Sequence, residues 1–478
     1  MKRRFQILVL NFSPLLLLLS CGSGEAPPRQ EEALVELTPS VWAAGRAGQA
    51  GVDQSWVRRF GDRDLTRLVR EAVVRNPDMI VAAERVNQAV IAARGANAES
   101  LPQASVSFSG NRQAQVFTGL LFPGVPQPFS SLADTVGAAL DVSWEPDIWG
   151  RVAAAQSAEI ARVGAEDNAK KAAQASLAGQ VVRAWLILGE ANEQIALAEE
   201  ARQVRKATEE AIRERFLSAL SEDGGTAAQL RLAQSDTATS EETIARWQGE
   251  VARAQRQLEL LAGRYPDGKT GEGVRLPELK SFPPTGLPSE LLQRRPDLLE
   301  AERRFAAATK DSEEADLARF PSFALTASSG RTSSELSDLL RSDFGVWSLG
   351  ANLTAPILSG GRLQANFAQA QSRERSALAV LQRTVLDAFG EVEQAIVADE
   401  YLARRIKALE RALQDAEESD RASGKDYADG VDSILTVLQV REQRIQIASQ
   451  LLSLRRQRLD NRVDLHLALG GDFQIREK

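Results

Sequence analysis

The clearest hydropathy pattern in the chain is a run of alternating positions from Leu132 to Glu145. Its even-numbered positions carry Leu, Val, Ala and Trp, its odd-numbered positions carry small or polar residues, and only Asp134 departs from the rule. A period of two predicts a strand with one apolar and one polar face. Three further segments alternate in the same way: one around Val106 and Phe108, one at Phe323–Ala327 and one at Trp347–Ala355. The pattern predicts four strands in two hairpins, at about 103–146 and 321–357.

These strands fit either a membrane barrel or a soluble β-sandwich. Strands of ten or more residues match the ~9–11 residues that cross a bilayer at a tilt. Aromatic residues near the strand ends would suit an interfacial girdle or a sandwich core, and they are Phe117, Phe122, Phe129, Trp144, Trp149, Phe344 and Trp347. A sheet in lipid has no open edge, and the smallest common barrels have about eight strands. If the strands are transmembrane, several chains must therefore share one barrel.

The other periodic segments predict helices. Leu65, Leu68 and Val69 begin a helix face near Asp62, and Pro77 interrupts it. Much longer helices are expected at Arg151–Arg215, Thr226–Leu261, Arg362–Ser423 and Ser433–Leu469, with turn-like breaks at Ser218–Gly225 and Ser423–Asp432. Leu378, Val385 and Val392 recur every seven residues, the period of a coiled coil. A helical tube and a solvated coiled-coil rod both fit this pattern.

The order of these segments repeats. The sequence RNPD at Arg75–Asp78 returns as RRPD at Arg294–Asp297, and in both copies a second proline follows 25 residues after the first and opens an alternating segment. The second copy starts with GLPSELLQRRPDLLEAE, Gly286–Glu302. A unit of this length exceeds the repeats that stack into solenoids. The sequence therefore predicts an internally duplicated chain, with repeats at 62–285 and 286–478.

The N-terminus reads as a secretory signal. Basic residues precede the apolar stretch Phe5–Leu19, which is shorter than the ~20 residues of a spanning helix. The sequence LLSC that ends at Cys21 is similar to a bacterial lipobox, in which the cysteine is lipidated. We expect a signal peptide at 1–20, a lipid on Cys21, and an anchor and strap at 21–61. An ordinary signal peptide with a chance cysteine is the alternative.

Composition excludes several classes of function. Cys21 is the only cysteine, so neither an intramolecular disulfide nor a cysteine-based zinc site can form. Loss of residues 1–20 changes the formal charge from −7 to −10, because it removes Lys2, Arg3 and Arg4 and no acid; this balance argues against nucleic acid as a partner. The single histidine, His466, stands between leucines and is expected to be structural. No phosphate-binding loop or carboxylate couple indicates an enzyme, a metal or a cofactor.

Together these motifs resemble the TolC-like outer-membrane efflux proteins, in particular the lipoprotein branch typified by OprM and NodT. The residues that carry the resemblance are Trp56, Phe60–Asp62, Leu65, Asn76–Asp78, Trp144–Arg151, Gly286–Glu302, Phe320–Ser322 and Pro356–Arg362. The resemblance implies an α+β membrane protein that forms a homotrimer, each chain giving four strands to a twelve-stranded outer-membrane β-barrel continued by a long α-helical periplasmic barrel. It also implies a passive exit duct for small molecules, with a periplasmic adaptor (membrane fusion protein) and an inner-membrane RND-type transporter as partners.

The resemblance further implies a periplasmic gate at the turn of the second helix pair. The candidate gate residues are Asp426, Tyr427, Asp429, Asp432, Thr436 and Gln439. The family tends to carry pore-lining acids at the positions that are Thr436 and Gln439 here. Asp426, Asp429 and Asp432 precede these two positions and would form an acidic aperture, because trimer symmetry would triple the charge of each. Their alternative roles, as turn residues or a helix cap, are equally open.

Two other functions remain compatible with the sequence. One is a TolC-like exit for type I protein secretion, which would share this architecture. The other is a non-channel lipoprotein that acts as a coiled-coil scaffold. The lipobox and Gly286–Glu302 favour the efflux channel.

Overall fold

The computed structural model describes residues 38–44, 56–117, 129–217 and 226–471. They divide into two compact units. Unit 1 includes 87–164 and 303–379, and contains the β-sheet; unit 2 includes 30–86, 165–302 and 380–478. The sequence predictions for Cys21 and for the break at Ser218–Gly225 lie outside the described residues.

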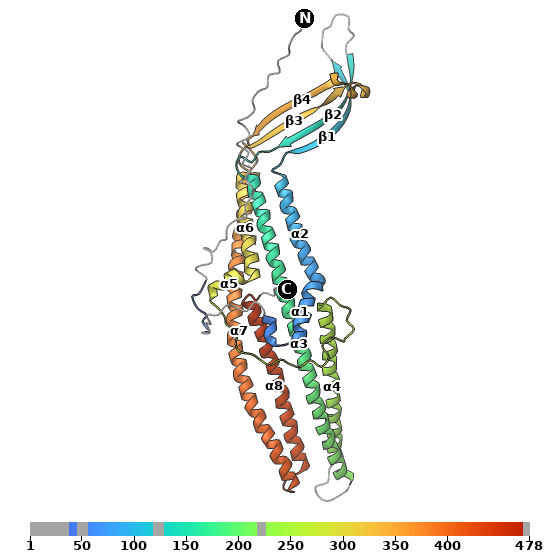
Figure 1. The fold of residues 1–478 in the computed structure, drawn as a ribbon, viewed down its shortest axis with the longest axis vertical. Helices are drawn as coiled ribbons and strands as arrows, with labels where there is room; N and C mark the ends of the chain where they lie inside the picture. Colours follow the sequence, from blue (N-terminus) through green and yellow to red (C-terminus); the bar gives the residue numbers. More distant parts are fainter. Residues whose placement is uncertain (1–37, 45–55, 118–128, 218–225, 472–478) are drawn as a thin grey trace. The chain divides into compact units, whose positions relative to one another are not determined.

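Unit 1 contains a single four-stranded antiparallel sheet with the strand order β1-β2-β3-β4 (Figure 1). Its strands are β1 (Gln103–Phe117), β2 (Phe129–Trp144), β3 (Ser322–Ser333) and β4 (Gly345–Thr354). The four predicted strands are therefore confirmed. The short 3₁₀ helices η4 (Leu336–Leu340) and η5 (Ser342–Phe344) lie between β3 and β4.

The strand register places the apolar positions of all four strands on one face. Val106 pairs with Leu140, Leu325 with Ala351, and Phe323 with Leu353, and paired residues point to the same side of a sheet. This face is bare: Phe108 is 81% exposed, Trp347 80% and Leu349 77%. No second sheet covers it among the described residues. The β-sandwich alternative is therefore wrong for this part of the chain, because a sandwich buries such a face.

Eight α-helices make up most of the rest of the described chain. They are α1 (Arg63–Arg75), α2 (Pro77–Ala98), α3 (Arg151–Leu217), α4 (Ala227–Leu261), α5 (Pro288–Arg294), α6 (Pro296–Leu317), α7 (Arg362–Ala428) and α8 (Ile434–Ala468); the 3₁₀ helix η3 (Trp56–Phe60) precedes α1. Both α3 and α7 contain 67 residues. Pro77 and Pro296 each open a new helix, since proline fits a first helical turn and not an interior.

One predicted boundary is wrong. The break expected at Ser423–Asp432 starts only after Ala428, because α7 continues through Ser423 and Gly424. A glycine inside a helix lowers helix stability by about 1 kcal/mol relative to alanine. The hydrogen-bonded turns on both sides of Gly424 in this 67-residue helix offset that loss. The helix ends where Gly430 adopts φ +74°.

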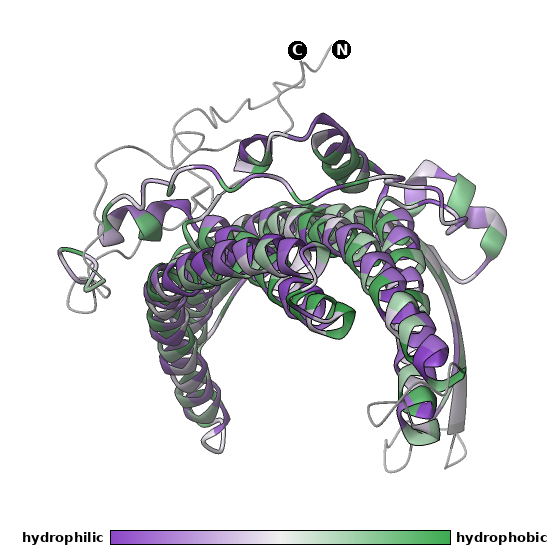
Figure 2. Ribbon diagram, turned by 90° about the horizontal axis from the view of Figure 1, so that it is seen from below, coloured by the Kyte–Doolittle hydropathy of each residue, from purple (hydrophilic) through white to green (hydrophobic). Residues whose placement is uncertain are grey.

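The helices are amphipathic or mixed in character. Hydrophilic and hydrophobic residues interleave along them (Figure 2). Among the described residues, no helix combines the length and the apolar composition that a bilayer crossing requires. The core of unit 2 gathers side chains from η3, α1, α3, α4 and α8, including Trp56, Leu65, Leu186, Leu258 and Val463.

The duplicated RNPD and RRPD sequences hold equivalent places in unit 2. In the first copy, the Asn76 side chain donates to the backbone oxygen of Leu261, at the end of α4 (2.9 Å). In the second, Arg295 donates to the backbone oxygen of Ala468, at the end of α8 (3.1 Å). Each copy therefore uses the residue before its proline to bind an unpaired carbonyl at the end of its own last helix. This explains why the motif recurs.

Candidate functional site

The six predicted gate residues lie in the turn between α7 and α8 and in the adjoining ends of the two helices: Asp426 and Tyr427 end α7, Asp429 and Asp432 lie in the turn, and Thr436 and Gln439 belong to the start of α8. The N–H of Val431 donates to the backbone oxygen of Asp426 (2.8 Å), and the N–H of Gly430 donates to that of Tyr427 (3.1 Å). With Gly430 at φ +74°, this is a Schellman motif, which satisfies the last carbonyls of a helix. Asp426 and Tyr427 thus contribute their backbone to the end of α7.

Ser433 caps the first turn of α8, and two other predicted gate residues, Asp432 and Thr436, lie beside it. The Ser433 hydroxyl accepts from the N–H of Thr436 (3.3 Å), and the two hydroxyls lie 3.3 Å apart. Asp432 Oδ1 accepts from the N–H of Ser433 (2.7 Å). Asp432 is therefore a turn residue in this structure, one of the two roles that the sequence left open, and Thr436 belongs to the helix start.

The remaining side chains of the turn are exposed. The carboxylates of Asp426 and Asp429 form no ion pair with any described residue. Tyr427 is 47% exposed, and Gln439 is also exposed. Sequence reasoning missed Val431, which is 79% exposed next to these acids. The α7–α8 turn, called the tip below, thus presents the carboxylates of Asp426 and Asp429 beside the side chains of Tyr427 and Val431.

Ion pairs brace the region behind this tip. Asp420 of α7 binds Arg441 (3.1 Å) and Arg444 (3.3 Å) of α8. Arg444 also binds Glu200 of α3. Arg205 of α3 binds Glu442 of α8 (2.6 Å). These pairs tie α8 to both α3 and α7, so the tip cannot move far as a unit unless some of them break.

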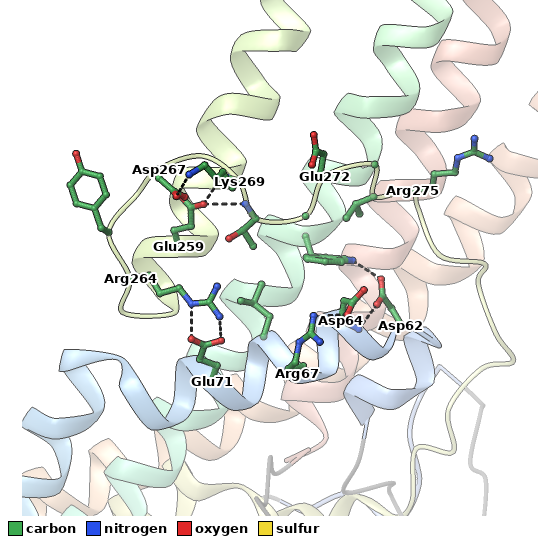
Figure 3. Close-up of a pocket in the computed structure, with 17 residues that line it drawn as sticks. Asp62, Asp64, Arg67, Glu71, Glu259, Arg264, Asp267, Lys269, Glu272 and Arg275 are labelled. Carbon is green, nitrogen blue, oxygen red and sulfur yellow. Dashed lines mark hydrogen bonds and ion pairs between the residues drawn. The ribbon is translucent and has the colours of Figure 1, made fainter.

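A hollow of about 840 Å³ lies in unit 2, between α1 and the loop that follows α4 (Figure 3). Six of its charged side chains form three ion pairs: Arg264 with Glu71, Lys269 with Asp267 (2.9 Å), and Arg67 with Asp64 (2.7 Å). The hydrogen bond from Arg264 lowers the pKa of Glu71.

The buried carboxylate that lines this hollow, Glu259, is also fully hydrogen-bonded. Glu259 is 1% exposed and accepts from the backbone N–H groups of Gly268 (2.7 Å), Lys269 (2.8 Å) and Thr270 (3.1 Å). Its carboxylate therefore shapes the loop. No group of His, Cys, Asp and Glu that could hold a metal ion occurs among the described residues. The ion pairs and hydrogen bonds that line the hollow therefore hold α1 and the loop after α4 in place.

A second charged cluster lies between α3 and α8. Arg456 binds both Glu190 and Asp460, and Glu190 is 5% exposed. Burial raises the pKa of Asp460 to about 6, although the charge of Arg456 opposes this shift. His466 lies farther along α8, is 4% exposed and stacks on Trp56 with ring centroids 5.5 Å apart, so the structural role predicted for it is confirmed.

Comparisons with known proteins cover nearly the whole chain. The family described as outer membrane efflux protein matches residues 68–264 and 287–471. The outer membrane protein OprJ of Pseudomonas aeruginosa is 31% identical over 467 residues, 96% of this chain and 95% of that protein. The probable outer membrane lipoprotein SilC of Salmonella typhimurium is 26% identical over 481 residues, 98% and 99% of the two chains. The open-state structure of the MtrE outer membrane channel of Neisseria gonorrhoeae has a TM-score of 0.79 and 25% identity, and the match covers 94% of this chain and 98% of that one.

Proposed function

The chain belongs to the outer membrane efflux protein family, and from this premise we propose that three copies assemble into one conduit. The protein is an outer-membrane channel, the exit duct of a tripartite efflux pump, and not an enzyme. In the proposed trimer, twelve strands form one barrel, and the long helices continue it as an α-helical tube through the periplasm.

The observation that carries this assembly is the open sheet of unit 1. β1 (15 residues) and β4 (10 residues) are the outer strands of the sheet and have a neighbour on one side only. Each unpaired backbone group in hydrocarbon costs several kcal/mol, so an open edge is not stable in a bilayer. Pairing β1 of one copy with β4 of the next removes both edges. The bare apolar face then contacts lipid.

The proposed processing and domain plan follows the same family pattern. A signal peptide at 1–20 is removed, Cys21 carries the covalent lipid, and residues 21–61 form the anchor and strap. The two repeats occupy 62–285 and 286–478. Support for the plan comes from the two separate matched segments and from SilC, which is named a probable lipoprotein. No cofactor other than the lipid is proposed.

We place the periplasmic gate at the turn between α7 and α8. Asp426 and Asp429 are exposed there without a described partner charge, and symmetry triples each of them. The adaptor and an RND-type transporter of the inner membrane supply the solute and the energy, so the duct itself conducts passively. Small molecules are its cargo.

The assembly is tested by native mass spectrometry of the protein extracted from outer membranes in detergent, followed by insertion into planar bilayers. We expect a trimer whose subunits begin at Cys21 and carry acyl chains, and which conducts ions across the bilayer. A Cys21→Ser variant should lose the acyl mass and remain trimeric. A lipidated monomer without conductance would overturn the shared barrel and favour the scaffold.

A further inference from the structure

The two faces of the sheet differ in their charged residues. Arg112, Asp134 and Arg331 lie on the apolar face, since Arg112 pairs with Asp134 and Arg331 with Ala138 in the strand register. The opposite face is formed mostly by Ser, Thr, Asn, Gln, Gly and Ala. In the described strands, Asp141 is the one ionisable residue on this polar face.

Asp141 lies among hydroxyl groups contributed by neighbouring strands. Its Oδ2 accepts from the Ser107 hydroxyl of β1 (2.7 Å), and the Ser328 hydroxyl of β3 also hydrogen-bonds to it. Ser105 and Ser328 are its direct register partners. Hydroxyls hold the carboxylate in place but do not cancel its charge. No described cation forms an ion pair with it.

We propose that Asp141 makes the lumen of the barrel selective for cations over anions. This inference rests on the shared barrel of the proposed function: once the apolar face contacts lipid, the polar face lines the lumen. Three copies then place three carboxylates in an otherwise uncharged wall of described strand residues. Rings of acidic side chains are a known basis of cation selectivity. Cationic and neutral solutes pass this segment more easily than anionic ones.

The width of the barrel determines whether the electrostatic field of three carboxylates reaches a passing ion. Barrels of about eight strands are filled by side chains, and those of 16–18 strands leave an aqueous channel. Twelve strands fall between these limits. The Debye length is about 30 Å at 0.01 M salt and about 3 Å at 1 M. Selectivity from Asp141 should therefore be strong at low salt and disappear at high salt.

A purely structural role is the competing explanation. The carboxylate joins β1, β2 and β3 through Ser107 and Ser328, and an asparagine would keep an acceptor for those hydroxyls while removing the charge. Asp141→Asn therefore separates the two roles. Asp134→Asn is the matched control, because Asp134 belongs to the same strand and lies on the opposite face.

The test measures the reversal potential of single trimers in planar bilayers under a KCl gradient of about 0.01 M to 0.1 M. All chains carry Asp426→Asn, Asp429→Asn and Asp432→Asn, so that the α7–α8 turn does not mask the barrel. We expect Asp141→Asn to lower the K⁺/Cl⁻ permeability ratio severalfold, Asp141→Glu to retain it, and Asp134→Asn to leave it unchanged.

The outcomes separate this inference from the proposed function. A conducting trimer whose permeability ratio is unchanged by Asp141→Asn would overturn the inference and leave the shared barrel intact; an equal loss in Asp134→Asn would do the same. If the unsubstituted chain forms no conducting trimer, the shared barrel fails and the inference fails with it.

Discussion

At the scale of single residues, Asp460 makes the stability of unit 2 depend on pH. Burial raises its folded pKa from 3.8 to about 6, and the carboxylates of Asp464 and Glu190 add to the rise while Arg456 and Arg183 oppose it. The folded state therefore holds this proton more tightly than the unfolded state. Its contribution to stability is complete below pH about 4 and is lost as pH rises through about 6. At pH 8 the charged carboxylate costs about 3 kcal/mol.

Asp460→Asn removes that cost, because the amide needs no proton to remain neutral. We expect the variant to be more stable than the parent at pH 8 and close to it at pH 4.5, so its unfolding midpoint should change less with pH. Thermal melts followed by circular dichroism at both pH values measure this. Asp415→Asn is the control on an exposed helix position. Equal pH dependence in parent and Asp460→Asn would show that another group titrates.

Residue chemistry that depends on local sequence could be predicted, and chemistry that depends on distant neighbours could not. A structural role for His466 is predicted from the leucines that flank it. Glu259 and Asp460 gave no such signal. Glu259 is buried because a loop folds over it, and Asp460 because α3, from a distant part of the chain, packs against α8.

At the scale of elements, two glycines allow the repeated helix ends to approach their proline motifs. Gly263 has φ +69°, and a Cβ there would lie 2.6 Å from the backbone oxygen of Arg75; Gly470, at the equivalent place in the second copy, has φ +74°. We expect Gly263→Ala to destabilise the protein by about 1–2 kcal/mol through its backbone conformation alone, and by more through the close contact.

Gly249→Ala supplies the matched control. Gly249 lies within α4, and a Cβ there would meet nothing within 4 Å. Alanine in an open helix position should stabilise by about 0.5–1 kcal/mol. Denaturant melts of the two variants should therefore shift in opposite directions. A shift of Gly263→Ala toward higher stability would contradict the packing described for the two repeats.

The α7–α8 turn gives a second prediction at this scale. Asp426→Ala combined with Asp429→Ala removes two exposed carboxylates and leaves the hydrogen bond from the N–H of Ser433 to Asp432 in place. If these acids narrow the gate, pore conductance should rise and cation preference should fall in planar bilayers. Asp415→Ala with Glu417→Ala, on the exposed surface of α7, is the control. Unchanged conductance and ion selectivity would exclude Asp426 and Asp429 from the gate.

Elements were predicted best where a period was long and uninterrupted. The alternation around Leu140 fixed both the strand and the face of each residue, and Pro77 marked the start of α2. The end of α7 was predicted five residues too early, since Ser423 and Gly424 are turn-like in composition but remain helical inside a long helix. The ion pair between Glu200 and Arg444 had no sequence signal, because helix periodicity does not specify which distant helix lies alongside.

At the scale of the whole molecule, the proposed shared barrel makes each chain dependent on its own copies. A chain with two open strand edges and a bare apolar face has no stable place in a bilayer alone. Folding of the barrel and association of the chains should therefore be one event, and barrel stability should depend on protein concentration in the membrane. The sequence indicates that several chains must share one barrel if the strands are transmembrane; the count of three rests on the resemblance, because strand number alone permits other multiples of four.

In the proposed duplication, each copy contributes a hairpin, and a hairpin returns the chain to the end of the sheet at which it entered. Whether each copy has an even or an odd number of strands therefore determines the side from which the next copy enters the membrane. With two strands per copy, the second copy enters the membrane from the same side as the first and keeps the same inside-outside polarity. An odd count would have inverted it. A tandem copy of such a half would therefore keep the membrane orientation of the first.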